Sequence, residues 1–369
     1  MRSAKLLPKR SVAVVLGTRP EIIKLSEIIR LLGPAALLIH TGQHYDSNLS
    51  EVFFRQLDLP APDVRLGIGG STRGRQIGEA IQALDQAFAE SQPAAAVAQG
   101  DTNTVLAASI AANAREVPLV HVEAGLRSYD RRMPEEHNRV VTDHLSDLLL
   151  APTETARNNL LAEGIPEPRI NVTGNTIVEA VRRLRPVGDE SDAILRSHDV
   201  APNRYVLATL HRPENVDDPL SLATILRQLA ALPIPVILPL HPRTTARISA
   251  FGLADVLSSV RVVDPIGYRE FLALGAGAAF LVSDSGGVQE EVSVYKRPLI
   301  VVRRSTERPE VLGTFAELIA PGDGITQVAT QWLDDLEGIH ARVATRESPY
   351  GDGSASERSV DAITQIVLT

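Results

Sequence analysis

Two series of short, continuous apolar runs, separated by segments of helical periodicity, limit most strongly what this chain can fold into. Because these runs do not alternate with polar residues, they indicate strands that are covered on both faces. Strands that alternate with helices predict parallel sheets. The runs are SVAVVL (11–16), ALLIH (36–40), AAAVA (94–98), PLVHV (118–122), DLLLA (147–151), INVT (170–173), YVLAT (205–209), PVILPL (235–240), VRVV (260–263), AFLVS (279–283) and PLIVV (298–302).

A charged segment with two prolines separates the first series from the second. The sequence therefore predicts an α/β protein with two doubly wound, Rossmann-like domains. We expect an N-terminal domain over residues 1–175, a linker or hinge over 176–203, and a C-terminal domain over 204–369 whose last helix returns to the first domain. Ligands bind outside the carboxyl ends of parallel strands, so two such domains can share one cleft.

Composition excludes several classes of protein. The net charge of −8 gives no basic surface for nucleic acid, and without cysteine there is neither a disulfide framework nor a thiol nucleophile. The apolar run near the N-terminus is too short for a signal peptide, and no run approaches the length of a membrane span. We expect a cytoplasmic protein with no membrane partner.

The first half places charged residues directly after its strands. GTRPEIIKL follows the first strand, and its Arg19 and Lys24 flank a helix start, which is typical of an anion site. After the run 94–98, Asp101 is expected to cap the next helix. Glu123 and the triplet Pro134-Glu135-Glu136 follow the run 118–122 in a densely charged loop.

The second half places His211-Arg212 after one strand and a glycine turn after another. In LVSDSGGVQEEVS the turn Ser285-Gly286-Gly287 precedes a helix expected to open at Gln289. Glycines let the backbone approach a ligand closely, and the helix start favours a diphosphate. Glu291 is placed to accept hydrogen bonds from ribose, and Arg308 lies beside the next strand end. The motif is neither a Walker loop nor a GxGxxG fingerprint.

These residues predict a nucleoside-diphosphate site that needs no metal. The three carboxylates of the first half, Asp101, Glu123 and Glu135, suit proton transfer better than phosphate binding.

Ten motifs occur in order along the chain: GTRPEIIK, GDTNT, HVEAGLRS, MPEEHNRVVTDHLSD, PTETARNNL, GNTIVEA, HRPENVD, HPR, SDSGGVQEE and TERPE. Together they resemble the non-hydrolysing UDP-N-acetylglucosamine 2-epimerases over nearly the whole length of the chain. The resemblance implies a glycosyltransferase-B-like architecture, a homodimer, no cofactor, and interconversion of UDP-N-acetylglucosamine and UDP-N-acetylmannosamine, for cell-surface polysaccharide synthesis.

The resemblance also assigns roles to individual residues. The matches to the family's catalytic residues are Asp101, Glu123, Glu135 and His211. The matches to its UDP-sugar-binding residues are Arg19, Lys24, Phe271, Ser285, Gly286, Gly287, Glu291 and Arg308. Gln43 matches a regulatory substrate site of some bacterial members, whereas Asp46 and the segment 69–75 differ from the pattern of that site.

Epimerisation at C2 requires loss of a hydrogen that is not acidic in the intact sugar. The expected route is cleavage of the C1–O bond, release of UDP with formation of a 2-acetamidoglucal, and re-addition with protonation on the other face. Three alternatives remain open: a 2-epimerase for a related sugar such as UDP-2,3-diacetamido-2,3-dideoxyglucuronate, a glycosyltransferase of the same fold, and a hydrolysing epimerase.

Overall fold

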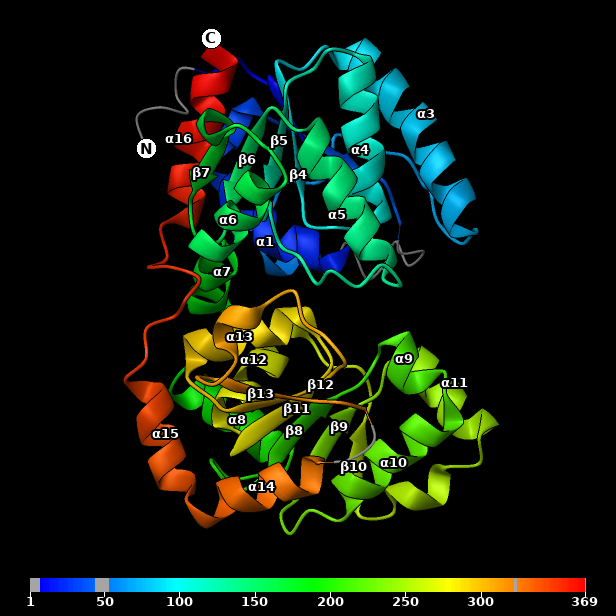
Figure 1. The fold of residues 1–369 in the computed structure, drawn as a ribbon, viewed down its shortest axis with the longest axis vertical. Coiled ribbons are helices and arrows are strands. Elements are labelled where there is room, and N and C mark those ends of the chain that lie inside the picture. The colour runs from blue at the N-terminus through cyan, green and yellow to red at the C-terminus, as the bar shows by residue number, and fades with distance from the viewer. Residues whose placement is uncertain (1–6, 44–52, 322–323, 369) are drawn as a thin grey trace. The chain divides into compact units, whose positions relative to one another are not determined.

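The computed structural model describes residues 7–43, 53–321 and 324–368. The chain packs as two units, which we call unit 1 (Met1–Ala180 with Tyr350–Thr369) and unit 2 (Val181–Pro349). The last helix, α16 (Ala355–Leu368), packs against α1 (Arg19–Leu32) in unit 1 (Figure 1). Helices α7 (Ile177–Leu184) and α8 (Asp189–Ser197) occupy the predicted linker.

Unit 1 contains a parallel sheet with the strand order β3-β2-β1-β4-β5-β6-β7 in its described part. The central strands are buried throughout, as their continuous apolar runs predict. The strands are β1 (Val12–Leu16), β2 (Ala36–His40), β3 (Val64–Arg65), β4 (Ala95–Gln99), β5 (Leu119–Val122), β6 (Leu148–Ala151) and β7 (Ile170–Val172).

Helices cover both faces of this sheet. On one face, α3 (Arg73–Ser91) and α4 (Asn103–Ala114) bury Leu84, Phe88 and Val105 against alternate residues of β1, β2 and β4. Helix α5 (Pro134–Leu145) packs beside α4, and α6 (Glu154–Ala162) follows β6.

Unit 2 contains a parallel sheet with the order β10-β9-β8-β11-β12-β13. Its strands are β8 (Val206–Thr209), β9 (Val236–Pro239), β10 (Val260–Val263), β11 (Phe280–Ser283), β12 (Leu299–Val302) and β13 (Ala316–Ile319).

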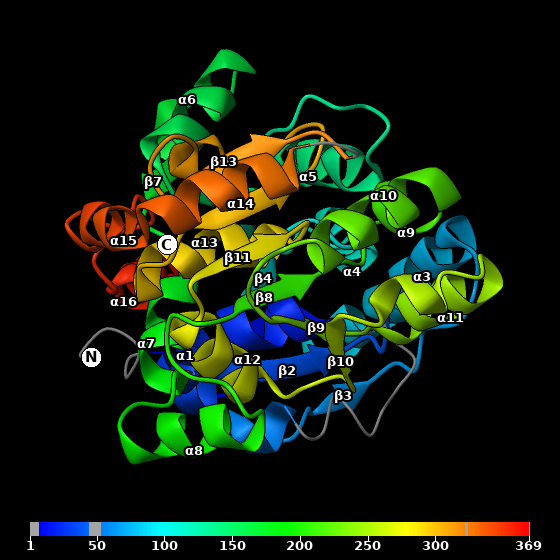
Figure 2. The same cartoon turned by 90° about the horizontal axis from the view of Figure 1, so that it is seen from below.

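Helices also cover both faces of the sheet in unit 2. Helices α10 and α14 pack on one face over a core of branched aliphatic residues, Phe280 and Trp332, and α12 packs against α8 and α13 (Figure 2). The helices are α9 (Pro213–Val216), α10 (Pro219–Ala230), α11 (Pro242–Ala250), α12 (Tyr268–Gly277), α13 (Gly286–Tyr295), α14 (Ile325–Asp334) and α15 (Leu336–Ala344).

All eleven predicted strands are present, and the prediction of two parallel α/β sheets is confirmed. In each unit the strand order reverses between two central strands, β1 and β4 in unit 1 and β8 and β11 in unit 2. Ligand sites in such sheets lie beyond the carboxyl ends of the strands at this reversal.

Candidate active site

At the reversal in unit 1, the turn after β1 is closely packed. A Cβ atom on Gly17 would lie 2.2 Å from Thr41 Oγ1 and 2.3 Å from Thr104 Oγ1, so only glycine fits. The next residues start α1, with Thr18 as its N-cap residue and a proline in the first turn. Arg19 is partly exposed there, and its guanidinium carbon lies 4.5 Å from the centre of the Phe53 ring.

Glu21 connects the first turns of α1 and α4. Its Oε2 accepts hydrogen bonds from the backbone N–H groups of Gly17 and Thr18, both at 2.6 Å, and Thr102 Oγ1 donates to Oε1 at 2.5 Å. Burial raises the pKa of Glu21 to about 7, although these hydrogen bonds favour the carboxylate. Glu21 is a site residue that was not predicted from the sequence.

Lys24 and Glu123, predicted separately, form a buried ion pair. Glu123 follows β5 with a φ of 69°, and its Oε2 also accepts hydrogen bonds from Gln99 Nε2 at 3.2 Å and Asn175 Nδ2 at 3.3 Å. A non-glycine residue with positive φ is uncommon, and such residues cluster at functional sites. Side chains from three other chain segments therefore fix the position of this carboxylate.

The prediction that Asp101 caps α4 is wrong. Thr102 is the N-cap residue, because its hydroxyl accepts the hydrogen bond from Val105 N. Asp101 lies one residue before the cap and pairs instead with Arg139 of α5, while Asn138 Nδ2 donates to its backbone oxygen at 2.8 Å. The Asp101 side chain is 29% exposed, so a ligand can still reach it.

The two adjacent glutamates of α5 have different surroundings. Glu136 is buried, pairs with Arg139, and accepts hydrogen bonds from the backbone N–H groups of Ser128 at 3.0 Å and Tyr129 at 2.9 Å. Burial opposes ionisation of Glu136, but these bonds and Arg139 lower its pKa below the ordinary value. Glu135 is half-buried and forms no hydrogen bond or ion pair within the described ranges. Glu136 thus holds the loop, and Glu135 is the acid available to a ligand.

The segment of the resembled regulatory site is described only in part. Gln43 Oε1 accepts hydrogen bonds from Thr104 N and Thr104 Oγ1, both at 2.9 Å, at the start of α4. Asp46 lies outside the described residues.

At the reversal in unit 2, a buried aspartate that the sequence analysis missed organises the strand ends. Asp284 accepts hydrogen bonds from His211 N, from Arg212 N at 3.0 Å and from Asn215 Nδ2 at 3.0 Å. It also contacts His211 Nδ1 at 2.9 Å. Burial opposes its ionisation, but His211 and these bonds lower the pKa of Asp284.

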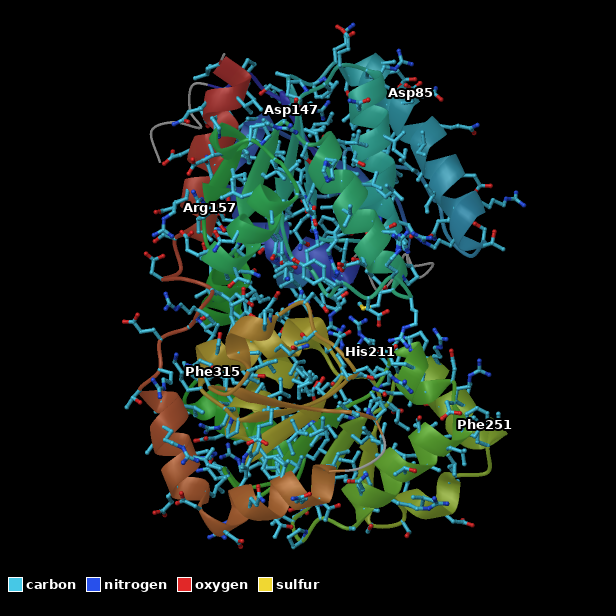
Figure 3. The ribbon with its side chains drawn as sticks, in the orientation of Figure 1. Asp85, Asp147, Arg157, His211, Phe251 and Phe315 are labelled. Atoms are coloured by element: carbon cyan, nitrogen blue, oxygen red, sulfur yellow. The ribbon has the colours of Figure 1, made fainter. Side chains whose placement is uncertain are left out.

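His211 lies between β8 and α9 (Figure 3), and its side chain is 48% exposed. A second histidine, His241, follows β9 and caps α11. Burial, together with the charges of His211 and Arg243, lowers the pKa of His241. The two His-Arg strand exits noted in the sequence are therefore close enough to interact electrostatically.

Helix α13 starts at Gly286, three residues earlier than predicted, with Ser285 as its N-cap residue. The two glycines thus form the first helical turn rather than a turn before the helix. One turn further on, Glu291 is buried and accepts a hydrogen bond from Tyr268 Oη at 2.8 Å. Tyr268 begins α12, which also carries the half-buried Phe271, so the residues assigned to ribose and uracil lie on neighbouring helices.

Arg308 is already held by carboxylates. Its Nε donates to Glu290 Oε1 at 2.6 Å, its Nη1 pairs with Glu307, and Glu307 also pairs with Arg303 at 2.8 Å. All four side chains are at most 7% exposed. Arg308 therefore packs against the start of α13 as part of a buried ionic network that sequence reasoning did not foresee.

Within the parts of the chain that the structure describes, no cluster of histidine, aspartate and glutamate has an arrangement suited to a metal ion. In the same residues, no helix combines the length and apolar character needed to cross a membrane.

Comparison with known proteins places this chain in a family. The family model for UDP-N-acetylglucosamine 2-epimerase matches residues 34–364. The UDP-N-acetylglucosamine 2-epimerase of Methanocaldococcus jannaschii is 41% identical over 364 residues, covering 95% of this chain and 98% of the relative. The chain belongs to the UDP-N-acetylglucosamine 2-epimerase family. The prediction of an epimerase is thereby confirmed.

Other members of the epimerase family show its range. The UDP-2,3-diacetamido-2,3-dideoxy-D-glucuronate 2-epimerase of Pseudomonas aeruginosa is 36% identical, covering 96% of this chain and 99% of the relative. The M. jannaschii enzyme, solved in complex with UDP-GlcNAc and UDP, superposes with a TM-score of 0.84 at 40% identity and covers 96% of this chain and 99% of its own. This structure agrees with the predicted glycosyltransferase-B-like fold of the chain.

Proposed function

We propose that this epimerase interconverts UDP-N-acetylglucosamine and UDP-N-acetylmannosamine by inversion at C2. The observation that carries the proposal is the set of carboxylates at the strand ends of unit 1, in a chain whose relatives carry that activity in their names. Asp101 and Glu123 are each held by a buried cation, and Glu135 is not held by any described side chain.

We assign UDP to unit 2. The N–H groups at the start of α13, at Gly286 and Gly287, suit a diphosphate, and Ser285 precedes them. Glu291, held by Tyr268, suits the ribose hydroxyls, and Phe271 the uracil. Because Arg308 is paired with two carboxylates and Lys24 with Glu123, we assign to Arg308 the role of positioning the helix start and to the dipole of α13 that of offsetting the charge of the leaving UDP.

Unit 1 supplies proton transfer in this proposal. Breaking the C1–O bond sends its electron pair to UDP, and a carboxylate takes the proton from C2, which leaves the 2-acetamidoglucal. The reverse addition, with a proton delivered to the opposite face of C2, gives the epimer. Two faces require at least two acid–base groups, and Asp101, Glu123 and Glu135 are the candidates. His211, oriented by Asp284, is the fourth proposed catalytic group.

A proton NMR time course with UDP-N-acetylglucosamine in D2O tests this function. The expected product is UDP-N-acetylmannosamine that carries deuterium at C2. Retention of the original hydrogen would exclude proton abstraction at C2. Release of free N-acetylmannosamine would identify a hydrolysing epimerase, and an unchanged sugar would refute the substrate.

A second candidate substrate is UDP-2,3-diacetamido-2,3-dideoxyglucuronate, favoured by the P. aeruginosa relative. That sugar has an additional carboxylate, and the exposed Arg131 of the loop before α5 is a cation available to it. Comparing kcat/KM for the two sugars in the protein and in Arg131→Ala separates the candidates. A preference for the diacetamido sugar that is lost in Arg131→Ala would replace the first proposal.

We also propose a cytoplasmic homodimer that serves cell-surface polysaccharide synthesis, with residues 204–369 carrying UDP, 176–203 acting as a hinge, and 1–175 carrying the acids. Light scattering of the purified protein measures the oligomeric state directly, and a monomeric mass would contradict the dimer.

A further inference from the structure

A fully buried histidine lies beneath the carboxylates of unit 1 without contacting a solvent-exposed surface. His121 belongs to β5, and its side chain and that of Asp143 on α5 are both 0% exposed. The His121 Nδ1 lies 2.6 Å from Asp143 Oδ1, and its Nε2 lies 2.8 Å from the backbone oxygen of Gly100. Both ring nitrogens therefore face oxygen atoms.

The partners of His121 determine its protonation. A backbone carbonyl only accepts hydrogen bonds, so Nε2 carries a hydrogen. The other oxygen of Asp143 accepts a hydrogen bond from Gly125 N at 3.1 Å and contacts Arg127 Nη1 at 2.7 Å. Two donors on one oxygen, one of them the cationic Arg127, indicate that Asp143 is an ionised carboxylate. An ionised carboxylate only accepts hydrogen bonds, so the Nδ1 atom that faces it carries a hydrogen as well.

The lowered pKa of Asp143 agrees with this assignment. Burial opposes its ionisation, but the charge and hydrogen bond of His121, and then those of Arg127, outweigh burial. Arg127 in turn pairs with Glu163, which His144 approaches at 3.6 Å. The titratable groups that surround the ring are thus Asp143 from α5, Arg127 from the loop after β5 and, beyond it, Glu163.

The atoms that this network holds belong to the residues next to the proposed acids. Gly100, whose oxygen receives the His121 Nε2–H, immediately precedes Asp101. Gly125, whose N–H is bound by Asp143, lies two residues after Glu123, which has the unusual φ of 69°. One histidine–aspartate pair therefore joins the ends of β4 and β5, the two strands that present Asp101 and Glu123.

We propose that His121 is a positioning residue whose two ring N–H groups, one to Asp143 and one to the backbone oxygen of Gly100, fix the spacing of Asp101 and Glu123. A neutral ring would lose one of its two hydrogen bonds, and with it the connection between the two strand ends. This inference rests on the proposed function only for its kinetic consequence, because the protonation of His121 is a property of the free protein.

The first test observes the ring directly. In protein labelled with ¹⁵N-histidine, His121 is assigned by the resonance missing in His121→Gln. Both ring nitrogens are expected to carry hydrogen in the folded protein, because each faces an oxygen that only accepts. A single ring N–H on His121 would overturn the proposal regardless of the substrate.

The second test separates positioning from substrate binding. In His121→Gln we expect kcat to fall about 10²-fold, the effect of a displacement of about 1 Å in a reacting group, with KM changed by less than about threefold. His144→Gln is the control: His144 is next to Asp143 on α5, but its side chain is 48% exposed, and this variant should retain wild-type kcat. If the folded His121→Gln variant has wild-type kcat, or an increased KM alone, the positioning role is refuted. If this variant does not fold, His121 is assigned instead by elimination, from single substitutions of the other eight histidines, and the ring resonances of the otherwise unsubstituted chain decide.

Discussion

Replacing each of the two glycines at the start of α13 by alanine tests two properties separately. Gly286→Ala is expected to affect protein stability, and Gly287→Ala is expected to affect nucleotide binding. Neither glycine has a positive φ, so backbone conformation does not require glycine at either position. At Gly286 the lack of space requires glycine, because an added Cβ would lie 2.6 Å from Arg308 Nη1 and 3.0 Å from Glu307 Oε1. At Gly287 the nearest atoms are Ser285 Oγ at 3.9 Å and Glu291 Oε1 at 4.0 Å, which are ordinary contacts.

Gly286→Ala should therefore destabilise the fold. The new methyl group must displace Arg308, which is held between two buried carboxylates. We expect a loss of about 1–3 kcal/mol in the free energy of unfolding, the usual cost of overpacking a close-packed site. Gly287→Ala should not destabilise the fold, because alanine is the better helix former by up to about 1 kcal/mol.

UDP binding should weaken in Gly287→Ala. If the N–H groups of this turn bind the diphosphate, the methyl group of Gly287→Ala obstructs its approach without disturbing the protein. The loss of one hydrogen bond to a charged group is worth about 1.5–3 kcal/mol, which corresponds to an increase of about 10- to 150-fold in the Kd for UDP.

Urea unfolding and calorimetric titration with UDP measure the two effects. Gly74→Ala is the control, because Gly74 is also the second residue of a helix and has no atom within 4 Å of an added Cβ. Wild-type affinity for UDP in Gly287→Ala would refute the placement of the diphosphate. Wild-type stability in Gly286→Ala would show that Arg308 moves at little cost.

Three further predictions address unit 1. Lys24→Met leaves Glu123 buried without its cation and should lower the free energy of unfolding by about 3–5 kcal/mol, whereas adding Glu123→Gln should recover much of that loss in urea unfolding. Glu135→Gln should reduce kcat at least about 10²-fold while the calorimetric Kd for UDP stays the same, and an active variant would remove Glu135 from proton transfer. Because burial raises the pKa of Glu21 from 4.5 to about 7, the folded protein retains a proton that the unfolded chain releases, so stability should fall as pH rises between those values, by on the order of 3 kcal/mol. Glu21→Gln should remove this slope, and an unchanged slope would contradict the assignment.

The sheet could be predicted from the sequence because most strands are buried on both faces. The two strands that no apolar run predicted are β3 and β13, and both lie at a sheet edge. An edge strand pairs with one neighbour only and has a solvent-facing side, so it can be short or contain charged residues. β3 has only two residues, and β13 contains Glu317. The local apolar pattern that identifies the central strands is absent from β3 and β13, whereas the edge strands β7 and β10 retain enough of it to be predicted.

The acids of the site could be predicted, but their partners could not. Lys24 and Glu123 are separated by 99 residues, and Arg139 reaches Asp101 across 38 residues. Such pairs depend on which strands become neighbours, and local sequence does not specify that order. The wrong capping assignment has the same origin, because the pull of Arg139 on Asp101 is a tertiary contact that leaves the cap to Thr102.

Each unit contains a buried aspartate, not predicted from the sequence, that contacts a histidine near a strand end. The role of the histidine differs between the two units. Asp143 and Asp284 are each fully buried, each accept backbone N–H groups at a strand end, and each contact a histidine Nδ1. In unit 1 the histidine lies within β5 and is fully buried, so it can act only through the residues it holds. In unit 2, His211 lies two residues beyond β8 and is 48% exposed, so its aspartate can orient a ring that a substrate reaches. A histidine near a strand end has the same local appearance in both cases, and its depth relative to the end of the strand decides between a positioning and a contacting role.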